Sequence, residues 1–411
     1  MKKQAIGLGV VGLGRAFTLM LPTFLQDERV RLVAATDPRA KARDMFRSDF
    51  NAPTYETLEE LCRDPDVEAV YIASPHQFHA EHVQVVAASG KAMLVEKPLA
   101  ISLEDCTRIV QLADQTKAPV IVGHSHSFNG PVLHAAGVLN SGRFGAVRML
   151  NALNYTDFLY RPRRPEELDT RQGGGVAFSQ AAHQVDIVRL LLGGLVDKVR
   201  ACTGNWDSNR PTEGAYMALL TTHDGTFASM TYSGYAHFDS DELMDNIGEM
   251  GYRKQDTAYG AARSKISQID ATREAELKTA SNYGGEDYGF KLPPPTPYHQ
   301  HFGPVIITAE RADIKLTPEG LMIYGDAERT FVPTPKRPVP RAEVIDELWC
   351  AVRLGLEPLH SARWARATTE ICIALLESAR TGEDVTLQFQ VAPSRFIALP
   401  DEDLLRDEHE R

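Results

Sequence analysis

The sequence predicts an α/β protein with an N-terminal Rossmann domain, a doubly wound parallel sheet, and a C-terminal α+β domain with a large, mostly antiparallel open sheet. Three observations support this fold. Short apolar strands alternate with helices through residues 5–123, a glycine turn follows the first strand, and alternating strands dominate after residue 193. The expected division is residues 1–125, residues 126–340 with an insertion at about 239–301, and residues 341–411. A chain of 411 residues is long enough for this plan.

Composition excludes several classes of partner. Apolar residues make up 43% and charged residues 24% of the chain, and the net charge is −11, which disfavours nucleic acid and anionic membranes. No apolar run reaches the length of a membrane span, and residues 1–4 lead into a strand without a signal-peptide pattern. Five scattered cysteines without a CxxC pair are typical of reduced thiols. We therefore expect a cytoplasmic protein.

The first strand and its glycine turn indicate a dinucleotide site. Residues 5–11 form an apolar strand, Gly12-Leu13-Gly14 follows, and a helical stretch begins at Arg15. In such a turn the first glycine makes the bend and the second lets the backbone approach a pyrophosphate at the helix N-terminus. The third glycine position is Phe17, so the pattern is imperfect.

The second strand, residues 30–35, ends in Thr36-Asp37. An aspartate at this distance accepts hydrogen bonds from ribose hydroxyls and repels a 2′-phosphate, which favours NAD over NADP. Arg39 lies close enough to soften that preference. The alternative is that Asp37 caps a helix before Pro38.

The alternation continues along the first domain. Helices are expected at residues 40–49, 58–64, 78–89 and 103–116, and strands at residues 67–73, 93–95 and 120–123. The strand at 93–95 runs into Glu96-Lys97-Pro98. A lysine just past the carboxyl end of a strand projects into the crevice where open α/β sheets bind ligands, and Pro98 restrains it, with a cis bond accessible at modest cost. The alternative is a solvated Glu96–Lys97 pair.

Three blocks of residues together resemble one family. Gly12-Leu13-Gly14-Arg15, then Ser74-Pro75-His76-Gln77-Phe78-His79, then Glu96-Lys97-Pro98-Leu99-Ala100 are similar in order and spacing to the Gfo/Idh/MocA family of nicotinamide-dependent oxidoreductases. The resemblance implies that Lys97 lies beside the nicotinamide and the substrate hydroxyl. His76 stands where the family commonly has asparagine, and His79 matches a family histidine whose role could also be packing or capping. The expected cofactor-binding residues are Gly12, Gly14, Arg15, Ala16, Phe17, Asp37, Ser74, Pro75, His76, His79, Glu96 and Lys97.

The second domain begins with a pair of histidines, His124 and His126. Spacing of i, i+2 invites a metal interpretation, but no third suitable ligand is spaced nearby, so no metal is expected. We expect both histidines to face the substrate pocket. The family often has an arginine pair at His126 and Ser127. A helix at residues 131–141 and a strand at 147–155 follow.

A loop rich in arginine is the most informative segment for the substrate. Tyr160, Arg161, Arg163, Arg164 and Arg171 lie between residues 160 and 171 of an otherwise acidic protein. Arginine binds carboxylates through a bidentate fork, which predicts an anionic substrate. The alternative, held equal, is a surface loop whose arginines pair with nearby acidic residues at positions 166, 167 and 169.

A glycine run at residues 173–175 precedes a helix expected at residues 176–192. Ser179, His183 and Asp186 are spaced i, i+4, i+7 and share one face. In the family, His183 matches a catalytic-site histidine and Asp186 a further aspartate, whereas Ser179 replaces an aspartate that often holds a sugar hydroxyl. That replacement counts against a simple sugar substrate. His183 could instead be a core histidine.

The remaining strands are expected at residues 199–203, 215–222, 226–232, 305–309, 314–317 and 320–324. In the family the open face of this sheet commonly forms a subunit interface, which implies a homodimer or homotetramer. The insertion at 239–301, with a helical part at 261–279, fits a lid, an arm onto a partner subunit, or a decorative loop. Helices at 341–355 and 361–381 pack back on the first domain in the family, and the charged tail after Pro400 is expected to be mobile.

These residues together predict an NAD-dependent dehydrogenase acting on a ring secondary alcohol, in carbohydrate or aromatic catabolism. Lys97 contacts the reacting hydroxyl and His183 acts as base or relay. The arginine loop, Ser179, the insertion and the length resemble the phthalate cis-dihydrodiol dehydrogenase branch, which implies a carboxylated cyclic cis-diol. The alternatives are a sugar, cyclitol or sugar-acid dehydrogenase, a redox-neutral NAD-dependent glycosidase, and a protein that senses NAD without chemistry.

Overall fold

The structure is a computed structural model that describes residues 5–255, 259–270, 273–289 and 291–394. The charged tail after Pro400 lies outside the described residues. Short 3₁₀ helices connect several elements, namely η1 (His76–Phe78), η2 (His126–Phe128), η3 (Phe158–Tyr160), η4 (Pro165–Leu168), η5 (Thr170–Gln172) and η7 (Ser240–Met244).

The N-terminal domain is a Rossmann fold, as predicted. Its six described strands are all parallel, in the order β3-β2-β1-β4-β5-β6. The strands are β1 (Ile6–Val11), β2 (Val30–Thr36), β3 (Thr54–Tyr55), β4 (Ala69–Ile72), β5 (Ala92–Val95) and β6 (Val120–Val122). The helices are α1 (Arg15–Gln26), α2 (Ala40–Phe50), α3 (Leu58–Arg63), α4 (His79–Ala88) and α5 (Leu103–Thr116). β3 was not expected, because two residues give no periodicity.

Burial explains why these strands are central. Every residue of β1, β4, β5 and β6 is buried, as expected for a parallel sheet with helices on both faces. The two C-terminal helices, α10 (Ala342–Leu354) and α11 (Ala362–Thr381), contribute apolar side chains to the cores on opposite faces of this sheet. The segments that follow β4 and β5 contact the second domain, through His76 and the Gln172 carbonyl and through Lys97 and the Ser179 carbonyl.

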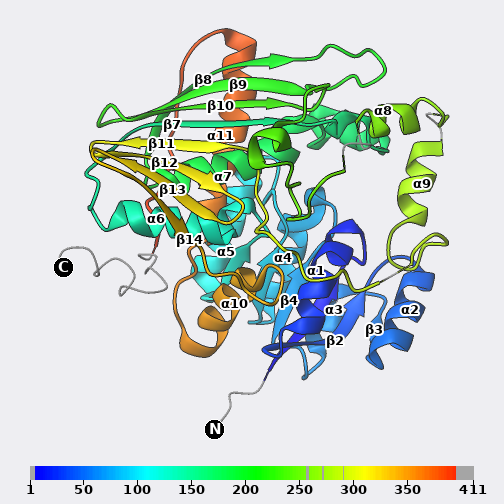
Figure 1. Ribbon diagram of the computed structural model, residues 1–411. Helices are drawn as coiled ribbons and strands as arrows, with labels where there is room; N and C mark the ends of the chain where they lie inside the picture. Colours follow the sequence, from blue (N-terminus) through cyan, green and yellow to red (C-terminus); the bar gives the residue numbers. More distant parts are fainter. Residues whose placement is uncertain (1–4, 256–258, 271–272, 290, 395–411) are drawn as a thin grey trace.

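The second domain is built on a sheet of nine described strands, in the order β14-β13-β12-β11-β7-β10-β9-β8-β15 (Figure 1). All neighbours are antiparallel except β7 and β10, which confirms the predicted fold class. The strands are β7 (Val147–Tyr155), β8 (Val196–Gly204), β9 (Ala215–Thr222), β10 (Phe227–Ser233), β11 (Val305–Ala309), β12 (Ala312–Thr317), β13 (Gly320–Gly325), β14 (Arg329–Pro333) and β15 (Val385–Thr386).

The two faces of this sheet differ. Helices α6 (Gly130–Asn140), α7 (Ala182–Leu191) and α11 pack on one face and form a large apolar core with it. The other face carries exposed apolar side chains at alternating positions, namely Met217, Leu219, Phe227, Ile306, Tyr324 and Phe331. An exposed apolar sheet face of this kind is typical of an interaction surface.

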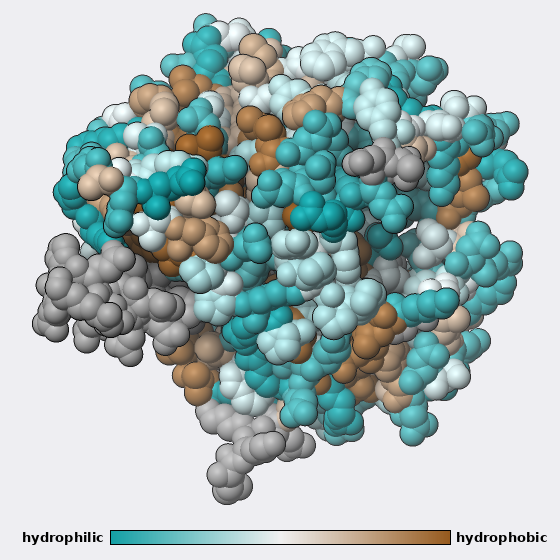
Figure 2. Space-filling model, viewed as in Figure 1, coloured by the Kyte–Doolittle hydropathy of each residue, from teal (hydrophilic) through white to brown (hydrophobic). Residues whose placement is uncertain are grey.

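The insertion joins the two domains. Its expected helical part is two short helices, α8 (Ala261–Ile266) and α9 (Glu274–Ala280), and α9 runs from the second domain toward α2 (Figure 1). Beyond α9, Tyr283 is fully buried, and its hydroxyl donates a hydrogen bond of 2.6 Å to Asp49. On the face of the molecule drawn in Figure 1, exposed apolar residues lie in separate patches among hydrophilic residues (Figure 2). The insertion is therefore packed on the Rossmann domain of its own chain.

Candidate active site

The glycine turn after β1 is shaped to receive a dinucleotide. Gly12 has φ of +89°, and a Cβ there would lie 2.8 Å from the carbonyl oxygen of Ala73. Gly14, which precedes α1, has open space around its missing Cβ. These residues leave the N-terminus of α1 accessible to phosphate, so the chain fits a bound dinucleotide at this turn.

Asp37 at the end of β2 anchors this turn. Its Oδ2 accepts a hydrogen bond of 2.7 Å from the backbone N–H of Leu13, and its Oδ1 accepts bonds of 2.9 Å from the Arg39 backbone and from Arg39 Nε. Arg39 also donates to the Leu13 carbonyl. The capping residue of α2 is Arg39, so Asp37 is not the cap itself. A role of Asp37 toward the cofactor ribose stays a prediction, with Arg39 directly beside it.

The first turn of α1 contains one expected cofactor residue, Phe17, whose side chain belongs to the core. Arg15 is exposed and Ala16 partly exposed at the start of the helix, but the Phe17 side chain is wholly buried. Its ring packs edge-on to Tyr283 of the insertion at 5.2 Å and beside Phe46 at 6.1 Å. Phe17 is a core residue whose side chain cannot contact a cofactor. A phenylalanine fits at this position because the insertion supplies Tyr283 to pack against it.

His76 and His79, which follow β4, form hydrogen bonds with backbone carbonyls of neighbouring loops. His79 is buried, and its ring nitrogens lie 3.0 Å from the carbonyl oxygens of Ser74 and Pro98. Burial lowers the pKa of His79 to about 4, so the neutral ring donates to one of these carbonyls. His79 thereby positions the segment after Lys97 and is not free for a cofactor. His76 Nε2 contacts the Gln172 carbonyl at 2.7 Å and so bridges the two domains.

The two other residues of this segment have different surroundings. The Ser74 hydroxyl contacts His82 Nδ1 at 2.8 Å. Pro75 is exposed. Neither arrangement tests their predicted contact with a cofactor.

Lys97 reaches across the crevice to the second domain. Its bond to Pro98 is cis, and Lys97 Nζ donates a hydrogen bond of 2.8 Å to the Ser179 carbonyl. Desolvation lowers the pKa of Lys97, against the opposing charges of Glu96 and Glu249. Glu96 accepts a hydrogen bond of 2.5 Å from Tyr71, and burial raises the pKa of the Glu96 carboxyl. The amine is thus held at the point where both domains meet.

A π-helical turn explains how Ser179 meets Lys97. Residues Ala177–Ala181 form a π-helix before α7, in place of the continuous α-helix expected at 176–192. The Ser179 hydroxyl donates a hydrogen bond back to the Gly175 carbonyl, and the Ser179 carbonyl accepts a hydrogen bond from Lys97 Nζ. The backbone of Ser179, rather than its side chain, contributes to the site. π-helical turns are frequent at functional sites.

His183 lies beside Lys97 with an unused nitrogen. Its side chain is 8% exposed, and its Nδ1 has no hydrogen-bond partner among the described residues. Its ring contacts His126 at 4.8 Å and Phe302 at 5.2 Å between ring centroids. Burial, and then the charge of Lys97, lower the pKa of His183 well below its ordinary value. At neutral pH the ring is uncharged and can accept a proton.

The two histidines at the start of the second domain, His124 and His126, pack in a cluster of aromatic rings. His124 is 6% exposed, faces His126 at 5.4 Å and stacks on Phe128 at 6.1 Å. His126 Nδ1 is 2.9 Å from Asn129 Nδ2, and His126 Nε2 is 3.1 Å from Glu249 Oε1. Both nitrogens of His126 are therefore used by the protein, and neither is free for a substrate.

Asp186, expected in the substrate pocket, lies in the interior instead. Its Oδ1 accepts hydrogen bonds from Trp364 Nε1 and Thr368 Oγ1 of α11, and its Oδ2 accepts one from Ser127 Oγ. The side chain is 6% exposed. Both oxygens have protein donors, so Asp186 fixes α7 to α11 and does not face a ligand.

The arginine loop divides between the two alternatives. Arg164 pairs with Glu166 at 3.1 Å, and Arg171, 89% exposed, pairs with Asp169 at 3.1 Å, as in the surface alternative. The charge of Arg161 bears on Glu249 and that of Arg163 on Lys97, although Arg163 also lies 3.9 Å from Glu167. Arg161 is half-exposed and 3.4 Å from Asp157.

Arg163 lies deeper than Arg161. Its guanidinium stacks on the Phe158 ring at 3.6 Å and donates a bond of 2.7 Å to the Phe158 carbonyl. Desolvation lowers the pKa of Arg163 to about 10. Tyr160 is covered by the guanidinium of Arg263 from α8, at 3.7 Å.

Two charged residues of the site had not been predicted. Glu249 comes from the insertion and lies 123 positions from its partner His126. Arg341, which precedes α10, donates to the Leu19 carbonyl at 3.3 Å, and its charge bears on Glu96 and Glu249. No spacing or motif links such distant positions, so the sequence alone carried no signal for either residue.

No helix among the described residues is long and apolar enough to cross a membrane. Within the described ranges, no three His, Cys, Asp or Glu side chains are grouped so as to hold a metal ion.

Comparisons with known proteins agree with the fold and identify the family. A model described as the oxidoreductase family with an NAD-binding Rossmann fold matches residues 6–124, and the GFO/IDH/MocA C-terminal domain matches residues 132–252. The 1-carboxy-3-chloro-3,4-dihydroxycyclo hexa-1,5-diene dehydrogenase of Comamonas testosteroni is 45% identical over 375 residues, 91% of this chain and 94% of that protein. 

Solved structures show the same fold. A protein from Bordetella bronchiseptica RB50, described as a dehydrogenase, has a TM-score of 0.87 and 40% identity, covering 93% of this chain and all of that chain. The WlbA dehydrogenase of Bordetella pertussis, solved with NADH and UDP-GlcNAcA, has a TM-score of 0.64 at 18% identity over 93% of this chain and 99% of that chain, which shows the shared fold alone. The chain therefore belongs to the Gfo/Idh/MocA family of oxidoreductases and is a dehydrogenase with an NAD-binding Rossmann domain.

Proposed function

We propose that this dehydrogenase oxidises a ring secondary alcohol of a carboxylated cyclic cis-diol, with NAD as the preferred cofactor. The observation that carries the proposal is the buried amine of Lys97, which bonds to the Ser179 carbonyl and lies close enough to the His183 ring to lower its pKa. The Comamonas testosteroni relative, whose name specifies a carboxylated dihydroxycyclohexadiene, supports the substrate class.

Residues of this chain bind the reacting hydroxyl and remove its proton. A nicotinamide dinucleotide held at the glycine turn would supply the hydride acceptor for this oxidation. Lys97 donates a hydrogen bond to the reacting oxygen and so stabilises the negative charge that develops there. His183 accepts the hydroxyl proton on its imidazole ring. Its neutral state at neutral pH follows from its lowered pKa.

Two arginines supply positive charge for a substrate carboxylate. Arg163 is close enough to Lys97 to contribute to its lowered pKa, and Arg161 is close enough to Glu249 to lower the pKa of that carboxyl. Arg161 is the more accessible of the two, since its side chain is 50% exposed whereas that of Arg163 is 10% exposed. We assign the contact with the substrate carboxylate to Arg161, and the more deeply buried Arg163 adds positive charge nearby.

Arg161→Met should therefore raise KM for a carboxylated diol by about 10- to 100-fold, because a charge-assisted hydrogen bond contributes roughly 1.5–3 kcal/mol. The expected change in kcat is small. Steady-state kinetics on the same preparation checks this, with Arg171→Met as the control because Arg171 is 89% exposed and pairs with Asp169. An equal rise in KM for both variants would remove Arg161 from the substrate site.

The outer face of the nine-stranded sheet supports a homo-oligomer, a dimer or tetramer. Its exposed apolar residues Met217, Leu219 and Ile306 lie on central strands of the sheet and form a surface suited to a second copy of the chain. Light scattering in solution should give a mass at least twice that of the 45.4 kDa chain. A monomer mass at working concentrations contradicts this assignment.

A further inference from the structure

The insertion carries a carboxylate into the active site on a well-supported turn. Ile247 and Arg253 pair as an antiparallel bridge, and between them Gly251 N–H bonds to the Gly248 carbonyl at 2.8 Å, which places Glu249 at the tip of a small hairpin. The Glu249 side chain is 39% exposed, so one side of the carboxylate meets solvent and the other meets His126. The backbone hydrogen bonds of the turn therefore hold Glu249 in position.

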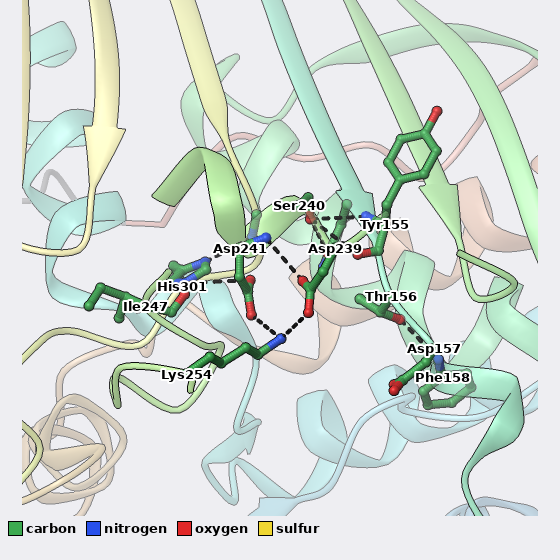
Figure 3. Close-up of polar contacts among 12 residues, drawn as sticks. Tyr155, Thr156, Asp157, Phe158, Asp239, Ser240, Asp241, Ile247, Lys254 and His301 are labelled. Atoms are coloured by element: carbon green, nitrogen blue, oxygen red, sulfur yellow. Dashed lines mark hydrogen bonds and ion pairs between the residues drawn. The ribbon is translucent and has the colours of Figure 1, made fainter. Parts of the chain in front are cut away.

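The base of this hairpin is tied down by charged side chains. Figure 3 shows Lys254 pointing between the carboxylates of Asp239 and Asp241, with His301 on the far side of Asp241. His301 Nε2 donates a hydrogen bond of 2.8 Å to the Ile247 carbonyl, and the His301 backbone N–H bonds to the Glu249 carbonyl at 3.2 Å. The position of Glu249 is thus fixed from both sides of the turn.

The hydrogen bonds of His126 define its tautomer. Asn129 Nδ2 donates to the Gln300 carbonyl at 3.0 Å, which orients the amide so that the same nitrogen donates to His126 Nδ1. His126 therefore carries its proton on Nε2 and donates it to Glu249 Oε1 at 3.1 Å. The other side of the imidazole packs edge-on to His183. A carboxylate, an imidazole and the predicted base stand in sequence.

The charged groups around His126 and Glu249 are mostly positive. Groups that bear on His126, His183 or Glu249 from the surrounding elements are His124 from the preceding loop, Lys97 after β5, Arg161 of the arginine loop, Tyr232 of β10, His301 of the insertion and Arg341 before α10. Desolvation raises the pKa of the Glu249 carboxyl, but His126, Arg161 and Arg341 outweigh it and lower that pKa to about 2. Glu249 is therefore ionised at every working pH. The Glu96 carboxylate, next to Lys97, accepts a hydrogen bond from the Tyr71 hydroxyl.

We propose that Glu249 is a positioning residue of the active site, whose negative charge acts through His126 to let His183 take the substrate proton. The proposal rests on the proposed function and concerns one proton: the substrate O–H bond breaks and an N–H bond forms on His183. Without a nearby negative charge, a protonated His183 would be repelled by the positive charges of Lys97 and Arg341. The Glu249 carboxylate offsets this repulsion and polarises the His126 ring against His183.

Glu249→Gln tests the proposal, because glutamine keeps the size and the hydrogen-bond acceptor but removes the charge. The expected result is a fall in kcat of about tenfold, with the dissociation constant for NADH unchanged. Loss of the carboxylate disfavours the protonated imidazoles, so the acidic limb of the kcat/KM profile should move to lower pH by about one unit. Glu249→Asp, which retains the charge, should recover part of kcat. Glu286→Gln is the control, since the Glu286 side chain is 85% exposed in the same insertion.

A second measurement separates this proposal from the proposed function. NMR titration of the His126 ring in the protein without substrate should show its midpoint falling in Glu249→Gln and held in Glu249→Asp. This result is expected even if no carboxylated diol is a substrate, in which case the proposed function fails and the charge coupling stands. A His126 midpoint and a pH profile that are unchanged in Glu249→Gln would overturn the proposal.

Discussion

Lys97→Met is expected to lower kcat by about 10²- to 10⁴-fold while the dissociation constant for NADH stays near that of the unaltered protein. The reason is the position of the amine. Lys97 Nζ lies at the domain boundary, 2.8 Å from the Ser179 carbonyl and close to His183. The glycine turn and Asp37, where we expect the dinucleotide, lie at the ends of β1 and β2. Steady-state kinetics and a fluorescence titration with NADH measure the two quantities.

The control for Lys97 is Lys91→Met. Lys91 precedes β5, at the end of that strand opposite Lys97, and its Nζ bonds to the carbonyls of Asp64 and Val67 away from the crevice. We expect near-normal kcat for this variant. Equal losses of turnover and NADH affinity in Lys97→Met would contradict a role at the reacting hydroxyl and indicate a role in cofactor binding alone.

Asp186→Ala is expected to lower the free energy of unfolding by about 3–5 kcal/mol, because it removes the acceptor of a buried polar network. The hydrogen-bond donors left behind are Trp364 Nε1, Thr368 Oγ1 and Ser127 Oγ. These groups come from α11 and η2, so the change loosens the contact of α11 with α7. Urea unfolding followed by circular dichroism measures the loss.

Asp114→Ala is a matched control for Asp186. Asp114 also bonds to α11, through a 2.6 Å ion pair with Arg363, but the two side chains are 46% and 49% exposed. Exposed pairs contribute at most about 1 kcal/mol, so this variant should unfold close to the unaltered protein. If both variants lose the same free energy, Asp186 does not have the structural role that its contacts indicate.

The fold was predictable because its signals are local. Apolar periodicity placed residues 103–116, 147–155, 215–222 and 305–309 in the elements that the structure contains, at the same bounds. The order of strands and helices then fixed a parallel first sheet. The short edge strands β3, β14 and β15 were not predicted, since pairing at a sheet edge depends on partners distant in the sequence.

The site was predictable only where one segment carries it. Lys97 and His183 were singled out from a strand end, a helix face and the family resemblance, and the charge of Lys97 bears on His183 in the structure. Their catalytic roles stay predictions. Helical spacing showed that Asp186 shares a side with His183, but not which neighbour that side meets, and the neighbour is α11. The π-helical turn at Ser179 and the hairpin at Glu249 depend on tertiary contacts, so neither follows from a local pattern.

The most direct test of the central claim is the formation of NADH, followed by its near-ultraviolet absorbance, with NAD and matched pairs of cyclic diols with and without a carboxylate. Inositol and neutral sugars complete the panel. We predict turnover with the carboxylated cyclic cis-diols, and little or none with their uncarboxylated partners. Turnover of neutral polyols, with none for any carboxylated diol, would contradict the assigned substrate class while leaving Lys97 and His183 in place.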